Sequence, residues 1–130
     1  HYGTLEEVLS KSDIVTLHCP LTEDSRNLIN QDRIAQMKKG AILINAARGP
    51  IVDSKALADA LNSGYLRGAG VDVFEMEPPL PMDHPLLHSI NTIVTPHIAF
   101  ASDESMEIRA EIVFENIQKW MNKEQVNIIL

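Results

Sequence analysis

The stretch AILINAARGPIVD, residues 41–53, passes from an apolar strand through a polar turn to the start of a helix. Its strand, residues 41–47, begins after Gly40, and Asp53 is of a type favoured at helix N-caps. Apolar residues follow at helical spacing until Gly64, which is typical of a residue just past a helix C-terminus. The stretch therefore predicts a strand and the helix that follows it.

The same alternation extends over the rest of the chain. Apolar or β-branched runs predict strands at residues 13–19, 41–47, 69–74 and 92–95. Favoured N-cap residues predict helices after Thr4, Asn30, Asp53 and Ser102. Strands and helices that alternate with short connections indicate one parallel sheet built from βαβ crossovers, with helices on both faces. The predicted fold class is α/β.

The composition limits the kinds of function. The 130 residues are 45% hydrophobic, which is enough for one domain with its own core. The net charge of -7 leaves no basic patch for phosphate backbones, so nucleic-acid binding is not expected. Cys19 is the only cysteine, which favours a reducing compartment, and no apolar run reaches the ~18 residues of a membrane-spanning helix. We therefore expect a cytoplasmic domain with no membrane partner.

Ligands of open parallel sheets bind in the crevice beyond the carboxyl ends of the strands. Polar or reactive side chains stand at the ends of the predicted strands, namely His18, Cys19, Arg48, Asp72 and His97. Glu77 follows in EMEPPLPMDHP, residues 75–85, where four prolines disfavour regular structure. Polar groups that converge on one crevice predict a small-molecule site at this edge of the sheet.

Arg48 lies in a turn between a strand end and a helix cap, where Gly49 allows the backbone to turn tightly. Its planar guanidinium can bind a carboxylate through two parallel hydrogen bonds, which would fix an acid substrate in position and orientation. A surface arginine paired with a neighbouring carboxylate is the ordinary alternative. The position at the strand end favours the ligand-binding interpretation.

His97 follows Pro96, and we expect its backbone to be extended just past a strand. An imidazole there can transfer a proton near neutral pH. Glu77 could orient that ring and stabilise its charged form. Taken singly, a structural histidine and a solvated carboxylate are the commoner roles, and the sequence does not show that the two side chains meet.

Other polar residues have weaker interpretations. Asp72 interrupts an apolar strand, so its carboxylate accepts from a cofactor amide or from a neighbouring backbone group. Cys19 is more typical of a reduced cysteine that lines the crevice than of a nucleophile. His18, His84 and His88 lack the spacing of metal ligands, so no metal is expected. We expect His84 and His88 at the surface or in loops.

Four ordered blocks of sequence are similar to one family. They are LHCPLT at residues 17–22, MKKGAILINAARGPIVD at 37–53, GAGVDVFEMEP at 68–78 and TPHIA at 95–99. Together they resemble the D-isomer-specific 2-hydroxyacid dehydrogenases, which include phosphoglycerate dehydrogenase and the glyoxylate and hydroxypyruvate reductases. The resemblance implies an oxidoreductase with a Rossmann-like NAD-binding domain. Such an enzyme transfers a hydride between NAD(H) and a small D-2-hydroxy acid or 2-keto acid.

The resemblance also implies roles for individual residues. Arg48 would bind the substrate carboxylate and keto oxygen, His97 would protonate that oxygen, and Glu77 would hold His97. Asp72 would contact the nicotinamide side of NAD. The residues implied to line the cofactor site are Cys19, Pro20, Ala46, Ala47, Arg48, Asp72, His97 and Ala99.

The family's glycine-rich GxGxxG turn is not found in this sequence. GAGVDV, residues 68–73, does not replace it, because it lacks the third glycine and runs into a strand rather than a helix. We therefore expect residues 1–100 to be the C-terminal half of the NAD-binding domain, and residues 101–130 to be a helix and tail that return toward a substrate domain.

The isolated chain is expected to be inactive, and the intact protein to be a homodimer or homotetramer. An NADH-sensing binding module of the corepressor type, without turnover, is the alternative function. The identity of the acid and the choice between NAD and NADP are not decided by the sequence.

Overall fold

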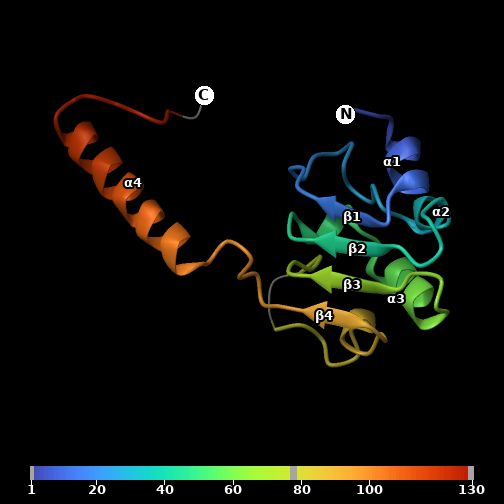
Figure 1. Cartoon of the computed structure of the whole chain (residues 1–130). Coiled ribbons are helices and arrows are strands. Elements are labelled where there is room, and N and C mark those ends of the chain that lie inside the picture. The colour runs from blue at the N-terminus through green and yellow to red at the C-terminus, as the bar shows by residue number, and fades with distance from the viewer. Residues whose placement is uncertain (1, 77–78, 129–130) are drawn as a thin grey trace. The chain divides into compact units, whose positions relative to one another are not determined.

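The computed structural model describes residues 2–76 and 79–128. The chain divides into two compact units, His1–His97 and Ile98–Leu130 (Figure 1). The first unit contains a sheet with its helices, and the second contains one long helix.

The main elements of the first unit are α1 (Leu5–Lys11), β1 (Ile14–Leu17), α2 (Gln31–Ile34), β2 (Ile42–Asn45), α3 (Ser54–Asn62), β3 (Gly68–Val71) and β4 (Thr92–Val94). Two short 3-10 helices, η1 (Gly49–Ile51) and η2 (Pro85–Leu87), lie in the connections. The strands are parallel and their order in the sheet is β1-β2-β3-β4 (Figure 1). The predicted α/β class with one parallel sheet is confirmed.

Each predicted helix begins at its predicted cap. The side chains of the four N-caps accept hydrogen bonds from backbone N–H groups in the first turn, and these caps are Thr4, Asn30, Asp53 and Ser102. Thr4 and Glu7 complete the expected capping box. Capping satisfies backbone donors that have no partner within the helix, so these residues fix where the helices begin.

The core lies between the sheet and the helices of the first unit. Strand side chains alternate between the two faces, and those on one face pack with buried residues of α1, α2 and α3. This cluster includes Leu9, Val15, Leu17, Ile34, Leu43, Leu57, Leu61 and Val71.

Consecutive strands advance in one direction across the sheet, so right-handed crossovers place α2 and α3 on the same face. On the other face Ile14, Ile44 and Ile93 are 56%, 37% and 73% exposed. Within the first unit, helices therefore cover one face of the sheet, whereas the sequence predicted helices on both.

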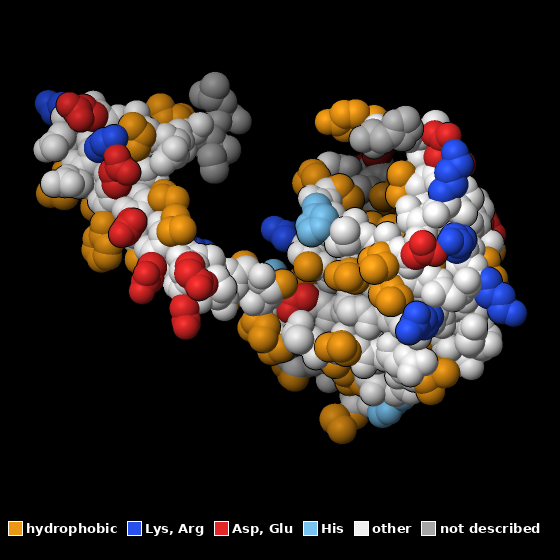
Figure 2. All heavy atoms as spheres, viewed as in Figure 1, with side chains coloured by type: hydrophobic (Ala, Val, Ile, Leu, Met, Phe, Trp, Pro, Cys, Tyr) orange, Lys and Arg blue, Asp and Glu red, His pale blue; other side chains and the backbone are white. Residues whose placement is uncertain are grey.

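The second unit contains α4 (Asp103–Met121), which begins after the predicted cap Ser102. Its apolar residues recur at helical spacing as predicted, yet no residue of α4 is buried. Figure 2 shows orange apolar side chains and red acidic side chains along this helix. Among the described residues, no helix combines the length and the apolar character needed to cross a membrane.

Candidate functional site

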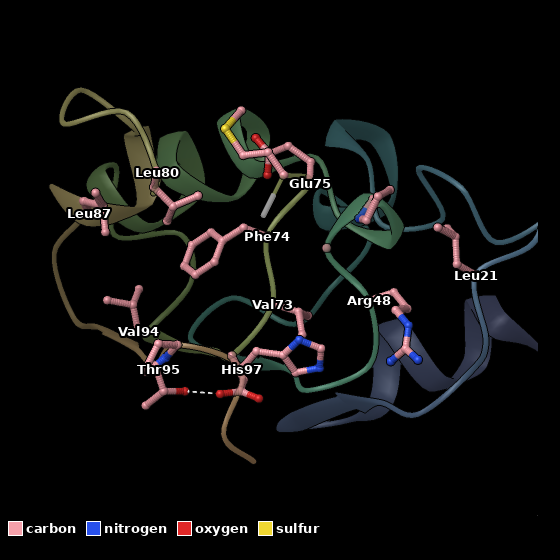
Figure 3. Close-up of a pocket in the computed structure, with 15 residues that line it drawn as sticks. Leu21, Arg48, Val73, Phe74, Glu75, Leu80, Leu87, Val94, Thr95 and His97 are labelled. Carbon is pink, nitrogen blue, oxygen red and sulfur yellow. Dashed lines mark hydrogen bonds between the residues drawn. The ribbon is translucent and has the colours of Figure 1, made fainter. Parts of the chain in front are cut away.

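A cavity of about 510 Å³ opens at the carboxyl ends of β3 and β4, beside the turn that follows β2 (Figure 3). The side chains of Arg48 and His97 lie on one side of this cavity, whereas the opposite side is apolar. The labelled apolar residues there are Phe74, Leu80, Leu87 and Val94. The cavity therefore offers cationic and proton-transferring groups at one end and a hydrophobic surface at the other.

Three predicted site residues line this cavity, namely Arg48, Asp72 and His97. They follow β2, β3 and β4, respectively. Parallel pairing of these strands thus brings together Arg48 and His97, which are 49 positions apart in the sequence. The other predicted site residues that the structure describes do not line it. Cys19 and Pro20 follow β1, Ala46 and Ala47 follow β2, Ala99 belongs to the second unit, and Glu77 lies outside the described residues.

Arg48 has an exposed side chain and lies in the turn after β2, where it lines the cavity. Its Nη1 donates to the carbonyl oxygen of Ala47 at 2.7 Å, and the guanidinium makes no other hydrogen bond to the described residues. The remaining N–H groups of the fork are thus available to a ligand. This arrangement suits the binding of a carboxylate.

Gly49 is required by a close approach rather than by an unusual backbone angle. A Cβ on Gly49 would lie 1.8 Å from the carbonyl carbon and oxygen of Phe74. Backbone that close leaves no room for any side chain. Gly49 therefore joins the turn that carries Arg48 to the segment that follows β3.

Asp72 is 5% exposed, and its carboxylate accepts a hydrogen bond of 2.5 Å from the Thr95 hydroxyl. Its backbone carbonyl accepts from the N–H of His97 at 2.9 Å. The pairing with Thr95 reduces the cost of burying a charged group next to the cavity. Asp72 thereby ties the end of β3 to the residues after β4.

His97 departs from the expected backbone conformation. The sequence predicted an extended backbone after Pro96, but the φ angle of His97 is +57°, in the left-handed region. A proline restricts the residue before it rather than the one after it, and the hydrogen bond from His97 N–H to Asp72 holds the turn. Non-glycine residues in this region are uncommon and are often found at functional sites.

The buried His84 pairs with the exposed Glu75, a contact that the sequence did not reveal. His84 is 4% exposed, so it lies in a loop as expected but not at the surface. Its Nδ1 accepts from the Leu86 N–H at 3.3 Å, its Nε2 lies 3.1 Å from Glu75 Oε1, and its ring packs edge-on against Phe74. Because Nδ1 is an acceptor, Nε2 carries the hydrogen and donates a hydrogen bond to Glu75 Oε1.

Glu75 also accepts from the Ser54 hydroxyl at 2.8 Å. Burial raises the pKa of Glu75, but hydrogen bonds from its own backbone, Ser54 and His84 outweigh this effect and hold that pKa below the ordinary value of 4.5. Glu75 therefore fastens the start of the proline-rich loop to α3 and to His84. Across the described residues, no group of three or more His, Cys, Asp or Glu side chains could hold a metal ion.

Comparisons with known proteins identify relatives of this architecture. Residues 1–99 match the family model of the D-isomer specific 2-hydroxyacid dehydrogenase, NAD binding domain. A glyoxylate reductase from Thermofilum pendens is 50% identical over 116 residues, which cover 89% of this chain and 34% of the relative. A hydroxypyruvate reductase from Blautia hydrogenotrophica is 41% identical over 128 residues, which cover 98% of this chain and 39% of the relative.

A crystal structure shows the same fold. The D-isomer specific 2-hydroxyacid dehydrogenase from Lactobacillus delbrueckii ssp. bulgaricus, in its NAD complexed form, matches with a TM-score of 0.89 and 32% identity. The match covers 100% of this chain and 43% of that one. The Rossmann-like fold is thus confirmed, and the chain spans less than half the length of these relatives.

Proposed function

Because the chain belongs to the D-isomer-specific 2-hydroxyacid dehydrogenases, with residues 1–99 matching their NAD-binding domain, we propose that its protein interconverts a small D-2-hydroxy acid and the corresponding 2-keto acid. NAD(H), when bound, supplies or takes up the hydride. The observation that supports this proposal most strongly is the convergence of Arg48, Asp72 and His97 on one cavity. Glyoxylate, hydroxypyruvate and phosphoglycerate-type acids are the proposed substrate class.

Arg48 is proposed to bind the acid. A 2-keto acid presents a carboxylate and a keto oxygen in one plane, and a guanidinium fork can donate to both. The exposed fork at the cavity and its single hydrogen bond to Ala47 support this role. Binding the acid in this way sets the orientation of the carbonyl carbon, which the hydride must reach.

His97 is proposed as the proton donor in the reductive direction. Its imidazole lies on the same side of the cavity as the Arg48 guanidinium (Figure 3). A proton from the imidazolium would neutralise the keto oxygen as the carbonyl carbon is reduced, and the reverse transfer would accompany oxidation. Glu77 is proposed to hold the ring and stabilise its charged form, as the family resemblance implies.

The residues present fit the nicotinamide end of NAD. The Asp72 carboxylate lies at the cavity wall, where it can accept from a carboxamide, and the strand-end location is where open α/β sheets bind nucleotides. Cys19, Pro20, Ala46, Ala47 and Ala99 are proposed to complete the cofactor wall.

The whole protein is proposed to be a cytoplasmic homodimer or homotetramer in which residues 101–130 return toward a substrate domain. The exposed apolar side chains of α4 support this proposal, because such side chains are typical of a helix that packs against another part of the protein. In the protein expressed from its complete reading frame, backbone amides of α4 are expected to exchange slowly with solvent. Fast exchange throughout α4 would contradict this arrangement.

The test of the activity uses the protein expressed from its complete reading frame. NADH and NADPH oxidation is followed with a panel of 2-keto acids, for the wild type, His97→Asn and His88→Asn. Asparagine tolerates the left-handed backbone of His97, so the first variant removes the proton donor with little strain. His88 is an exposed histidine outside the cavity lining and serves as the matched control.

We expect turnover with at least one acid, a loss of about 10²- to 10⁴-fold in kcat for His97→Asn, and little change for His88→Asn. Equal activity of His97→Asn and wild type would refute the role of His97. Tight NADH binding without turnover of any acid would refute the enzyme and favour the nucleotide-sensing module.

A further inference from the structure

Asn45, the last residue of β2, has a buried polar side chain that no sequence motif singled out. It is 1% exposed, and both ends of its side-chain amide are hydrogen-bonded to the turn that follows. Oδ1 accepts from the N–H of Ala47 at 3.1 Å, and Nδ2 donates to the carbonyl of Arg48 at 3.1 Å. Asn45 thus clamps the three-residue turn that carries the proposed substrate-binding arginine.

The backbone of Asn45 connects this clamp to the other strand ends. Its carbonyl accepts from the N–H of Asp72 at 2.9 Å, and the Asp72 carbonyl accepts from the N–H of His97 at 2.9 Å. One series of hydrogen bonds therefore runs across the ends of β2, β3 and β4. Through it, the turn that Asn45 holds is tied to the position of Asp72 and His97.

We propose that Asn45 is a positioning residue that acts through Arg48, an inference that rests on the proposed function. The peptide unit between Ala47 and Arg48 lies between two peptide units that Asn45 holds. Before it, the Ala47 N–H donates to Asn45 Oδ1, and after it, the Arg48 carbonyl accepts from Asn45 Nδ2. Arg48 Nη1 donates to the Ala47 carbonyl at 2.7 Å, so the guanidinium is bonded to a peptide unit that Asn45 fixes at both ends.

Catalysis is sensitive to small displacements of the group that holds the substrate. Displacing a substrate-positioning group by about 1 Å can cost about 10²-fold in rate. Loss of the amide would free the turn from Asn45 to Arg48, although Gly49 would still pack against Phe74. Arg48 would then keep its charge but lose its fixed direction.

Two variants of Asn45 separate the clamp from general packing. Asn45→Ala removes both hydrogen bonds. Asn45→Ser keeps a short side chain whose hydroxyl oxygen can still accept from the Ala47 N–H, as serine does in comparable turns. Asn62→Ala is the matched control, because the Asn62 amide oxygen also accepts from a backbone N–H, that of Ile90 at 3.1 Å, and Asn62 does not line the cavity.

The test is a double-mutant cycle of Asn45→Ala and Arg48→Ala in the protein expressed from its complete reading frame, with kcat and KM measured for the 2-keto acid and for NADH. For Asn45→Ala we expect a loss of about 10- to 100-fold in kcat/KM for the acid. The KM for NADH should change less than about twofold, and Asn45→Ser should recover part of the loss. Adding Asn45→Ala to Arg48→Ala should lower kcat/KM by less than about twofold, because the residue it positions is gone.

Losses that multiply in the double variant would overturn the proposal, as would an Asn45→Ala effect no larger than that of Asn62→Ala. If the wild type reduces no acid, the proposed function fails, and hydrogen exchange of the Ala47 amide tests the clamp by itself. Faster exchange in Asn45→Ala, without a change in the slowest-exchanging strand amides, supports the clamp. Unchanged exchange refutes it.

Discussion

Gly49 lies so close to Phe74 that any side chain at position 49 would overlap the Phe74 carbonyl group. The two residues are 25 positions apart in the sequence. Each lies a few residues past the carboxyl end of a strand. Their contact holds the turn after β2 against the segment after β3. The position of Arg48 relative to the segment after β3 therefore depends on the absence of a side chain at residue 49.

Gly49→Ala is expected to destabilise the chain by about 3 kcal/mol, because the backbone of Phe74 must move to admit the methyl group. Gly70→Ala is the matched control, since a Cβ there would lie 3.9 Å from the Ile44 side chain, an ordinary contact. Urea unfolding followed by circular dichroism measures both variants. Equal destabilisation of the two would contradict the close approach as the cause.

His84→Ala is expected to destabilise the chain by about 3 kcal/mol, because it leaves a cavity beside Phe74 and removes partners from Glu75 and the Leu86 N–H. His88→Ala, at an exposed position four residues along, removes one exposed hydrogen bond to the Met82 carbonyl and should cost no more than about 1 kcal/mol. Thermal unfolding of the two variants makes the comparison. Similar melting temperatures for both would show that burial of His84 contributes little.

Glu75→Gln is expected to change how stability depends on pH. The pKa of Glu75 is lowered in the folded chain, so its ionised form contributes stability above the ordinary pKa of 4.5 and this contribution is lost as pH falls through the lowered value. The wild type should therefore exceed Glu75→Gln in stability at neutral pH, and the difference should shrink below about pH 4.5. Urea midpoints between neutral and acid pH test this, with Glu23→Gln at an exposed position as the control. Parallel curves for wild type and Glu75→Gln would contradict the expectation.

Arg48→Lys is expected to lower kcat/KM for the 2-keto acid by about 10- to 100-fold, because lysine keeps the charge but cannot donate two parallel hydrogen bonds. Most of the change should be in KM if Arg48 holds the acid equally in the ground and transition states. Arg26→Lys, at an exposed position that does not line the cavity, should leave both constants unchanged. Full activity of Arg48→Lys would show that a positive charge at position 48 is enough to bind the acid, and would contradict the need for two parallel hydrogen bonds.

Local signals predicted much of the fold. Thr4, Asn30, Asp53 and Ser102 were identified as caps because a cap depends on residues within one helical turn, and all four make the expected hydrogen bonds. The rule that ligands bind at the carboxyl ends of the strands requires only that the strands are parallel. That rule placed Arg48, Asp72 and His97 at one edge, and the structure places them around one cavity.

Features that depend on contacts between distant residues were not predictable in this way. The need for Gly49 comes from Phe74, and the left-handed backbone of His97 accompanies its bond to Asp72. Burial of His84 likewise depends on Phe74 and Glu75, which precede it by about ten residues across an irregular loop. Asn45 was missed for another reason: its partners are adjacent, but nothing in the sequence distinguishes a turn clamp from an ordinary strand residue.

The order β1-β2-β3-β4 is also the order of synthesis. Each strand pairs with the strand made just before it, so the sheet can grow one strand at a time as the polypeptide leaves the ribosome, with little loop-closure entropy at any step. Arg48 reaches the growing edge first, then Asp72, and His97 last, after β4 has docked. A nascent chain that stops before β4 therefore lacks Val94, Thr95, Pro96 and His97, which line the cavity.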